Sequence, residues 1–234
     1  MNNPLMFVFA SAFPVLFFLF LILRKDKQQE PPKLLLKCFI GGFIAAVIAI
    51  IIEFILGIFG NTLEGDFSKA FYTAFIVAAG TEELVKWFIV KRLVWTNPEF
   101  DQHYDGIIYA VFVSLGFALI ENLMYVFNGG LHVALMRGVL AVPGHGFFAV
   151  IMGYFLSLAK FEKGSQRSRH MVFSLLMPII FHGLYDFALM YMGNLGEKNP
   201  MLSLGLAILF SVVVIRLWIV GFKNIRKHLI KDGM

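Results

Sequence analysis

The chain has 234 residues, of which 59% are hydrophobic and 15% are charged, and its mean hydropathy is +0.79. Soluble domains contain about 45–50% apolar residues, so this composition excludes a soluble globular protein and predicts a polytopic membrane protein. The net charge of +5 does not indicate nucleic-acid binding, because the basic residues lie in short segments that flank apolar runs. The single Cys38 excludes an internal disulfide.

Seven apolar runs have the length of about 20 residues that a helix needs to cross ~30 Å of hydrocarbon. They lie at 4–23, 38–59, 70–92, 106–127, 138–159, 171–192 and 201–222. No cleavage site follows the first run, so we expect a retained span rather than a signal peptide. The segment LHVALMRGVLAVPGHG, where the fifth run starts, contains Arg137 and Pro143, so this run is expected to begin with a short interfacial or broken segment.

The loops between these runs differ in charge. Lys and Arg number fifteen in the segments after the first, third, fifth and seventh runs, against three (Lys69, Arg137 and Lys198) in the opposite loops. Positively charged loops stay in the cytoplasm. The sequence therefore predicts one all-α membrane domain over residues 1–234, a bundle of about seven transmembrane helices with the N-terminus outside and the C-terminus in the cytoplasm.

The third run carries Glu82, Glu83 and Lys86 within five residues. Each charge costs about 2.5–3.5 kcal/mol at the bilayer centre, so a polar function is expected there. Glu82 and Lys86 are four residues apart and share a helix face, so we expect them to pair. Glu83 is turned about 100° away and is expected to be free to act. A structural ion cluster is the alternative.

Three later runs add further ionisable groups. Glu121 lies in FALIEN, His145 lies between two glycines in PGHGFF, and His182 and Asp186 lie in FHGLYD. Asp186 follows His182 by four residues, so its carboxylate can accept a hydrogen bond from the imidazole and fix its tautomer. At a rise of ~1.5 Å per residue, these groups fall in the middle or outer half of the membrane. One water-filled pocket that opens outward would satisfy them together.

Histidines and carboxylates around water support hydrolysis in two ways. A divalent metal would lower the pKa of its water to about 7. Alternatively, a glutamate acts as general base while a histidine donates to the oxyanion. The residues leave both routes open, whereas the sequence contains no HExxH, no Gly-x-Gly-Asp in an apolar run and no Gly-x-Ser-x-Gly, which argues against serine and aspartyl mechanisms.

The set Glu82-Glu83-x-x-Lys86, Phe117-x-x-x-Glu121, His145 and His182-x-x-x-Asp186 resembles the PrsW family of bacterial intramembrane proteases, which is distantly similar to the CAAX-prenyl-endopeptidase and Abi membrane proteins. The resemblance covers about residues 70–192. It implies a metal-dependent protease of the bacterial cell membrane that makes the first cut in a single-pass anti-sigma factor, on its extracytoplasmic side. That cut would start regulated intramembrane proteolysis and release a sigma factor for stress transcription. Glu121 stands where the CAAX enzymes have His, and Lys86 stands one position before their Arg, which argues against prenyl-protein processing.

We expect a catalytic set on the four runs, made of Glu82, Glu83, Lys86, Glu121, His145, His182 and Asp186. The metal expected is Zn²⁺, held by His145 and His182 with a carboxylate from Glu83 or Glu121 and one position open for water. A CAAX-type endopeptidase, a non-enzymatic assembly subunit and a proton-coupled transporter are the alternatives, because intramembrane Glu, Asp and His are also typical of proton relays. Glu53 in the second run has no motif around it, and a packing, proton-linked or site role is open.

Overall fold

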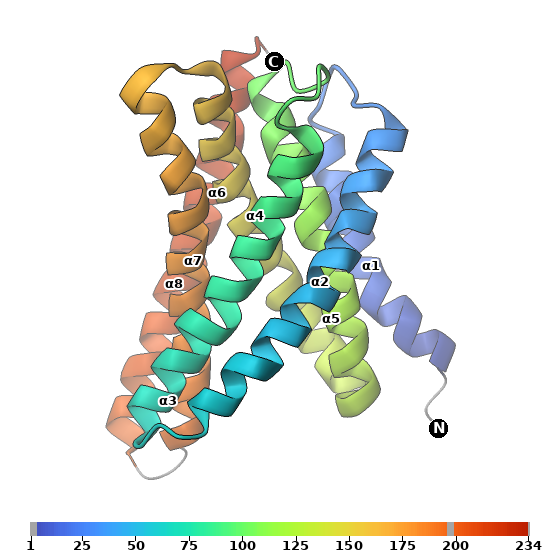
Figure 1. Cartoon of the computed structure of the whole chain (residues 1–234). Helices are drawn as coiled ribbons and strands as arrows, with labels where there is room; N and C mark the ends of the chain where they lie inside the picture. Colours follow the sequence, from blue (N-terminus) through green and yellow to red (C-terminus); the bar gives the residue numbers. More distant parts are fainter. Residues whose placement is uncertain (1–3, 196–198, 234) are drawn as a thin grey trace.

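The computed structural model describes residues 4–195 and 199–233, and every regular element in these ranges is helical, which confirms the predicted all-α class. The elements are α1 (Pro4–Leu23), α2 (Pro32–Gly60), α3 (Asp66–Tyr72), η1 (Thr73–Gly80), α4 (Thr81–Val94), α5 (His103–Val139), α6 (Ala141–Phe161), α7 (Gly164–Leu195) and α8 (Pro200–Lys231). Figure 1 shows them as a bundle in which α1 begins at the end opposite to the end of α8.

Five helical runs are long and apolar enough to cross a membrane, namely Pro4–Leu23, Pro32–Gly60, His103–Phe161, Gly164–Gly193 and Pro200–Lys231. The run His103–Phe161 contains two helices, α5 and α6. The expected third span is not among the five, because residues 66–94 are divided among α3, η1 and α4. These three elements nevertheless follow one another directly, with helical backbone angles at the junction residues Tyr72, Thr73, Gly80 and Thr81.

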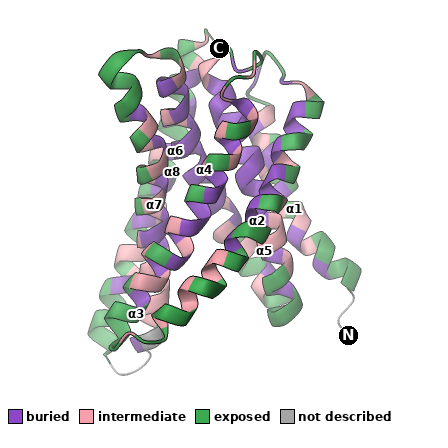
Figure 2. Ribbon diagram, in the orientation of Figure 1, coloured by how far each residue is buried: buried purple, intermediate pink, exposed green. Residues whose placement is uncertain are grey.

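Exposed positions on the outer helices are apolar, which suits contact with lipid. Phe9, Phe54 and Met201 are 70%, 74% and 80% exposed. Figure 2 shows the buried residues gathered in the middle of the bundle. In an apolar stretch of 18 residues within the run that contains α5 and α6, 72% of the residues are buried, against 22% to 33% in such stretches of the other four runs, so this run forms the centre of the molecule.

The close approach of α5 to its neighbours depends on glycine. A Cβ on Gly153 of α6 would lie 2.3 Å from the carbonyl oxygen of Gly106 on α5. A Cβ on Gly42 of α2 would lie 2.1 Å from the carbonyl oxygen of Val113. Any side chain at either glycine would force the helices apart. The absence of a Cβ therefore brings α2, α5 and α6 together around the space that the ionisable residues occupy.

Two departures from the regular α-helix lie beside that space. The π-helical stretch η1 ends directly before α4, and π-helical turns occur frequently at functional sites. The helix α5 breaks at Gly130, where φ is 76°, a value that glycine adopts far more readily than other residues. The short piece Leu131–Val139 follows this break. The expectation of a broken segment before Pro143 is confirmed.

Candidate active site

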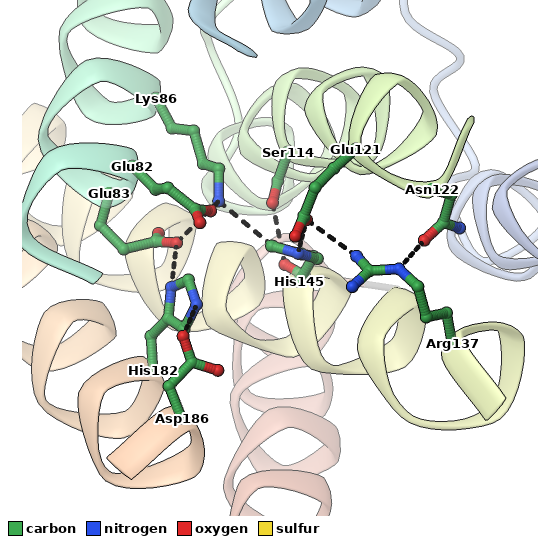
Figure 3. Close-up of polar contacts among 10 residues, drawn as sticks. All are labelled: Glu82, Glu83, Lys86, Ser114, Glu121, Asn122, Arg137, His145, His182 and Asp186. Atoms are coloured by element: carbon green, nitrogen blue, oxygen red, sulfur yellow. Dashed lines mark hydrogen bonds and ion pairs between the residues drawn. The ribbon is translucent and has the colours of Figure 1, made fainter. Parts of the chain in front are cut away.

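The predicted site residues meet inside the bundle, although they come from four helices (Figure 3). The helix α4 supplies Glu82, Glu83 and Lys86, α5 supplies Glu121, α6 supplies His145, and α7 supplies His182 and Asp186. Separate hydrogen bonds and ion pairs link them into one continuous network. Isolated charges in a membrane are costly, so the network accounts for their presence in apolar helices.

Lys86 is the centre of this network. Its side chain is fully buried, and Nζ lies 2.8 Å from Glu82 Oε2, 2.9 Å from Glu83 Oε1 and 3.2 Å from His145 Nδ1. The ammonium also lies 4.0 Å from the centre of the Phe117 ring. The expected pair of Glu82 with Lys86 is confirmed, but the expectation that Glu83 is free is wrong. The long lysine side chain reaches both glutamates because residues three and four positions apart are neighbours on a helix.

His182 is held between two carboxylates. Its Nδ1 lies 3.0 Å from Glu83 Oε1, and its Nε2 lies 3.3 Å from Asp186 Oδ2, so the expected pairing with Asp186 is confirmed. The ring stacks on Phe148 with a centroid distance of 4.7 Å. Contacts on both edges and one face fix the orientation of this imidazole. The second oxygen of Glu83, Oε2, is buried and has no hydrogen-bond partner among the described residues.

His145 has one tautomer that satisfies its contacts. A lysine ammonium can only donate, so Nδ1 of His145 accepts from Lys86 and Nε2 carries the proton. Nε2 then donates to Glu121 Oε2 over 2.8 Å. The rings of His145 and His182 lie 5.5 Å apart between centroids. The two histidines are therefore neighbours, as the sequence predicted, and each lies against a different glutamate.

Arg137 also contacts these residues, although the sequence analysis did not include it in the site and used it only as a loop charge and as a sign of a broken segment. Its Nη2 lies 3.0 Å from Glu121 Oε2, its Nε donates to Asn122 Oδ1 over 2.7 Å, and its guanidinium lies 4.1 Å from the centre of the Tyr125 ring. The break at Gly130 makes this contact possible. An arginine in an apolar run that also contains a Gly-Gly pair was the available signal in the sequence.

The network borders a cavity of about 580 Å³. Its polar lining includes Glu53, Glu82, Glu121, Asn128, Arg137, His145, His182 and Asp186. Glu82 retains 6% exposure whereas Glu83 and Lys86 have none, so Glu82 is the member of the pair that reaches the cavity. Glu83 lies behind it, against Lys86 and His182. A peptide or a water molecule in the cavity would meet Glu82 first.

The donor set fits a divalent metal. Two groups of three ligand atoms lie within 4.8 Å of one another, one from Glu82, Glu121 and His145 and the other from Glu82, Glu83 and His182. Glu82 belongs to both groups, and each contains one of the two histidines. The network holds four carboxylates, and the described residues contribute two permanent cations to it, Lys86 and Arg137, so two carboxylates have no permanent cation to balance them. A divalent cation would neutralise them.

Carboxylates and imidazoles around a cavity inside an apolar bundle are the groups that a membrane-embedded hydrolase uses. Residues 30–218 match the PrsW family intramembrane metalloprotease. The "Protease PrsW" of Clostridioides difficile (strain 630) is 38% identical over 222 residues, which cover 92% of this chain and 88% of the relative. That of Oceanobacillus iheyensis is 36% identical over 180 residues, covering 77% and 81%, and that of Bacillus subtilis (strain 168) is 34% identical over 172 residues, covering 74% and 77%. No solved structure matches the chain.

The chain therefore belongs to the PrsW family of intramembrane metalloproteases, and it is a membrane peptidase. The resemblance found in residues 70–192 is confirmed, and the match extends well beyond them on both sides. Because the chain belongs to this family, peptidase chemistry is a better explanation for the buried acids and histidines than proton-coupled transport.

Proposed function

We propose that the protein makes the first cut in a single-pass membrane anti-sigma factor, on the outer side of a bacterial plasma membrane, and so starts the release of a sigma factor under stress. The observation that supports the proposal best is the position of the cavity. Its lining includes Glu53, Thr73 and Met190, each within seven residues of a helix end that lies opposite to the C-terminus. A cavity there receives the outer flank of a membrane-spanning substrate.

The proposal includes a topology of seven spans, with residues 66–94 as the third, the N-terminus outside and the C-terminus in the cytoplasm. The fifteen-to-three distribution of Lys and Arg supports this orientation. A reporter fused after Met234 should be active only in the cytoplasm, and one inserted near Gly65 only outside. The reverse pattern would place the cavity at the cytoplasmic side and remove the main support for an extracytoplasmic cut.

Zn²⁺ is the metal that we propose, held by His145 and His182 with a carboxylate from Glu83 or Glu121. In the structure the two histidines belong to separate groups of close ligand atoms that share Glu82, so binding by both histidines requires the two groups to close around one ion. When bound, it would supply Lewis-acid activation of water and of the scissile carbonyl. Glu82 reaches the cavity and would accept the proton of the attacking water. Asp186 orients His182, and Lys86 offsets the charges of the adjacent glutamates.

Cleavage of defined substrates tests the peptidase assignment. The purified protein and its Glu83→Ala variant would be reconstituted in vesicles with a single-pass anti-sigma reporter, and the fragments sequenced by mass spectrometry. We expect a cut on the extracytoplasmic side with the wild type and a loss of cleavage with the variant. If the wild type cuts other single-pass proteins but no anti-sigma reporter, the substrate assignment is wrong.

Elemental analysis tests the metal. We expect about one zinc per chain, loss of cleavage after chelation, and recovery when zinc is added back. Full activity of metal-free protein would rule out the metal and leave the second route, in which a glutamate acts as general base and the histidines donate to the oxyanion. In that case the geometry favours Glu82 as the base, because Glu83 does not border the cavity.

A further inference from the structure

Glu53 borders the active-site cavity, and the chemistry described so far does not use it. It lies on α2, seven residues before the end of that helix at Gly60. Its Oε1 is shielded from solvent and has no hydrogen-bond partner in the part of the chain that the structure describes. Neither of the two groups that could hold a metal includes it.

The surroundings of Glu53 do not neutralise it. The nearby acids Glu82 and Glu121 repel its charge. Lys86 and His182 attract it, but each already contacts two other carboxylates. Arg137 is the cationic side chain among the described residues that line the cavity, and it contacts Glu121. An intramembrane carboxylate without a partner is costly, because it has lost its hydration and gained nothing in return.

A peptide substrate can bring the missing partner. The side chains of Lys and Arg are the cations that a protein chain supplies, and both form charge-assisted hydrogen bonds with carboxylates. Of the α2 residues that line the cavity, Glu53 is the nearest to the helix end at Gly60. In the proposed topology this is the outer end, where the flank of a membrane-spanning substrate would enter. Glu82, at the reaction centre, lines the same cavity. A basic residue bound at Glu53 would thus lie within a few residues of the cut bond.

We propose that Glu53 is a specificity-determining residue that selects substrates with Lys or Arg close to the cut bond on the outer flank. The inference rests on the proposed function, since it requires a single-pass protein that enters from the outer side. Beyond the proposed function, it specifies that the enzyme recognises a positively charged side chain in its substrate.

A charge-exchange experiment tests this inference. Three reporters that differ only in Lys, Gln or Glu at successive outer-flank positions would be cleaved by wild type, Glu53→Gln and Glu53→Lys, with rates normalised to inserted enzyme. We expect the wild type to prefer the best-placed Lys reporter over its Glu counterpart by about tenfold, the effect of ~1.4 kcal/mol. Glu53→Gln should bring the ratio close to one, and Glu53→Lys should invert it.

Glu64→Lys is the matched control, because Glu64 is exposed in the loop after α2 and the substitution changes the charge at the same end of the molecule. It should keep the wild-type preference. Equal Lys-to-Glu ratios for wild type and Glu53→Gln, with activity retained, would overturn the role of Glu53 and leave the proposed function intact. If Glu53→Lys does not insert, the ratio for Glu53→Gln decides. Failure of the wild type to cut any single-pass reporter would overturn both.

Discussion

Two groups of buried or half-buried acids lie in this molecule, and they are stabilised differently. In the membrane interior, Glu82, Glu83, Glu121 and Asp186 each lie within 3.3 Å of a lysine, arginine or histidine nitrogen. At the end of the bundle that holds the C-terminus, Asp26, Glu30 and Asp105 accept hydrogen bonds from neutral donors, namely backbone N–H groups and the hydroxyl of Tyr109.

The difference predicts that the two groups of acids have different roles. Fixed cations favour the ionised form of a carboxylate, the form that accepts protons and binds metals. Burial among neutral groups favours the protonated form, and it raises the pKa of Glu30 to about 7 and that of Asp26 above its ordinary value. Substitutions in the first group should therefore change catalysis, whereas those in the second should change the pH dependence of stability.

The largest effect is expected from the reactive group. Glu82→Ala, Glu83→Ala and His182→Ala should each lower cleavage by orders of magnitude, because residues that act as one catalytic unit fail together. Abundance in the membrane should stay near that of wild type. Cleavage rates normalised to inserted protein measure this, with Glu64→Ala and His132→Ala, both at exposed positions, as controls. A loss of abundance parallel to the loss of activity would support a structural ion cluster instead.

Substitution of Lys86 should lower both catalytic activity and stability. Pairing with Glu82 alone, which the sequence predicts, would make Lys86→Ala less harmful than loss of a glutamate, because the lysine would only position that residue. Its contacts with both glutamates and His145 change that expectation. Removing one partner from a buried ion pair costs about 3–5 kcal/mol, so we expect loss of activity together with a lower unfolding temperature in detergent. An unchanged unfolding temperature would contradict this.

Much of the architecture could be predicted because bilayer thickness dictates the length of an apolar run, and charges within such runs are too costly to be incidental. Helix spacing predicted that His182 meets Asp186, a contact within one turn. Contacts between different helices were harder to predict from the sequence. Which glutamate of the Glu82-Glu83 pair reaches the cavity depends on the rotation of α4, and the π-helical turns of η1 alter that rotation. The contact of Arg137 with Glu121 depends on the break at Gly130, which no spacing rule specifies.

A smaller effect on catalysis is expected at Arg137, which contacts the same oxygen of Glu121, Oε2, as His145 does. Arg137→Gln should lower cleavage by about tenfold to a hundredfold, because Glu121 loses its charged partner but keeps the bond to His145. Arg137→Lys should recover part of this loss, since a lysine keeps the charge and loses the two-pronged contact with Glu121 and Asn122.

A double variant tests whether Arg137 contributes to cleavage through its contact with Glu121. If the arginine acts through Glu121, then adding Arg137→Gln to Glu121→Gln should cause little further loss of cleavage. Additive losses in the double variant, or a lysine variant no better than the glutamine variant, would show that the contact with Glu121 is not the means by which Arg137 contributes.

The smallest effect is expected at Glu30, in the second group of acids. Because its pKa is raised from about 4.5 to about 7, the folded protein keeps a proton that the unfolded chain releases, and stability falls as pH rises across that window. Glu30→Gln removes this titration, so the variant should match wild type at pH 5 and unfold a few degrees higher at pH 8. Thermal unfolding at both pH values measures this, with Glu99→Gln, exposed at the same end, as the control. Equal pH dependence in wild type and Glu30→Gln would mean that Glu30 is ionised in the folded protein. Glu30 would then not differ from the first group of acids in its ionisation.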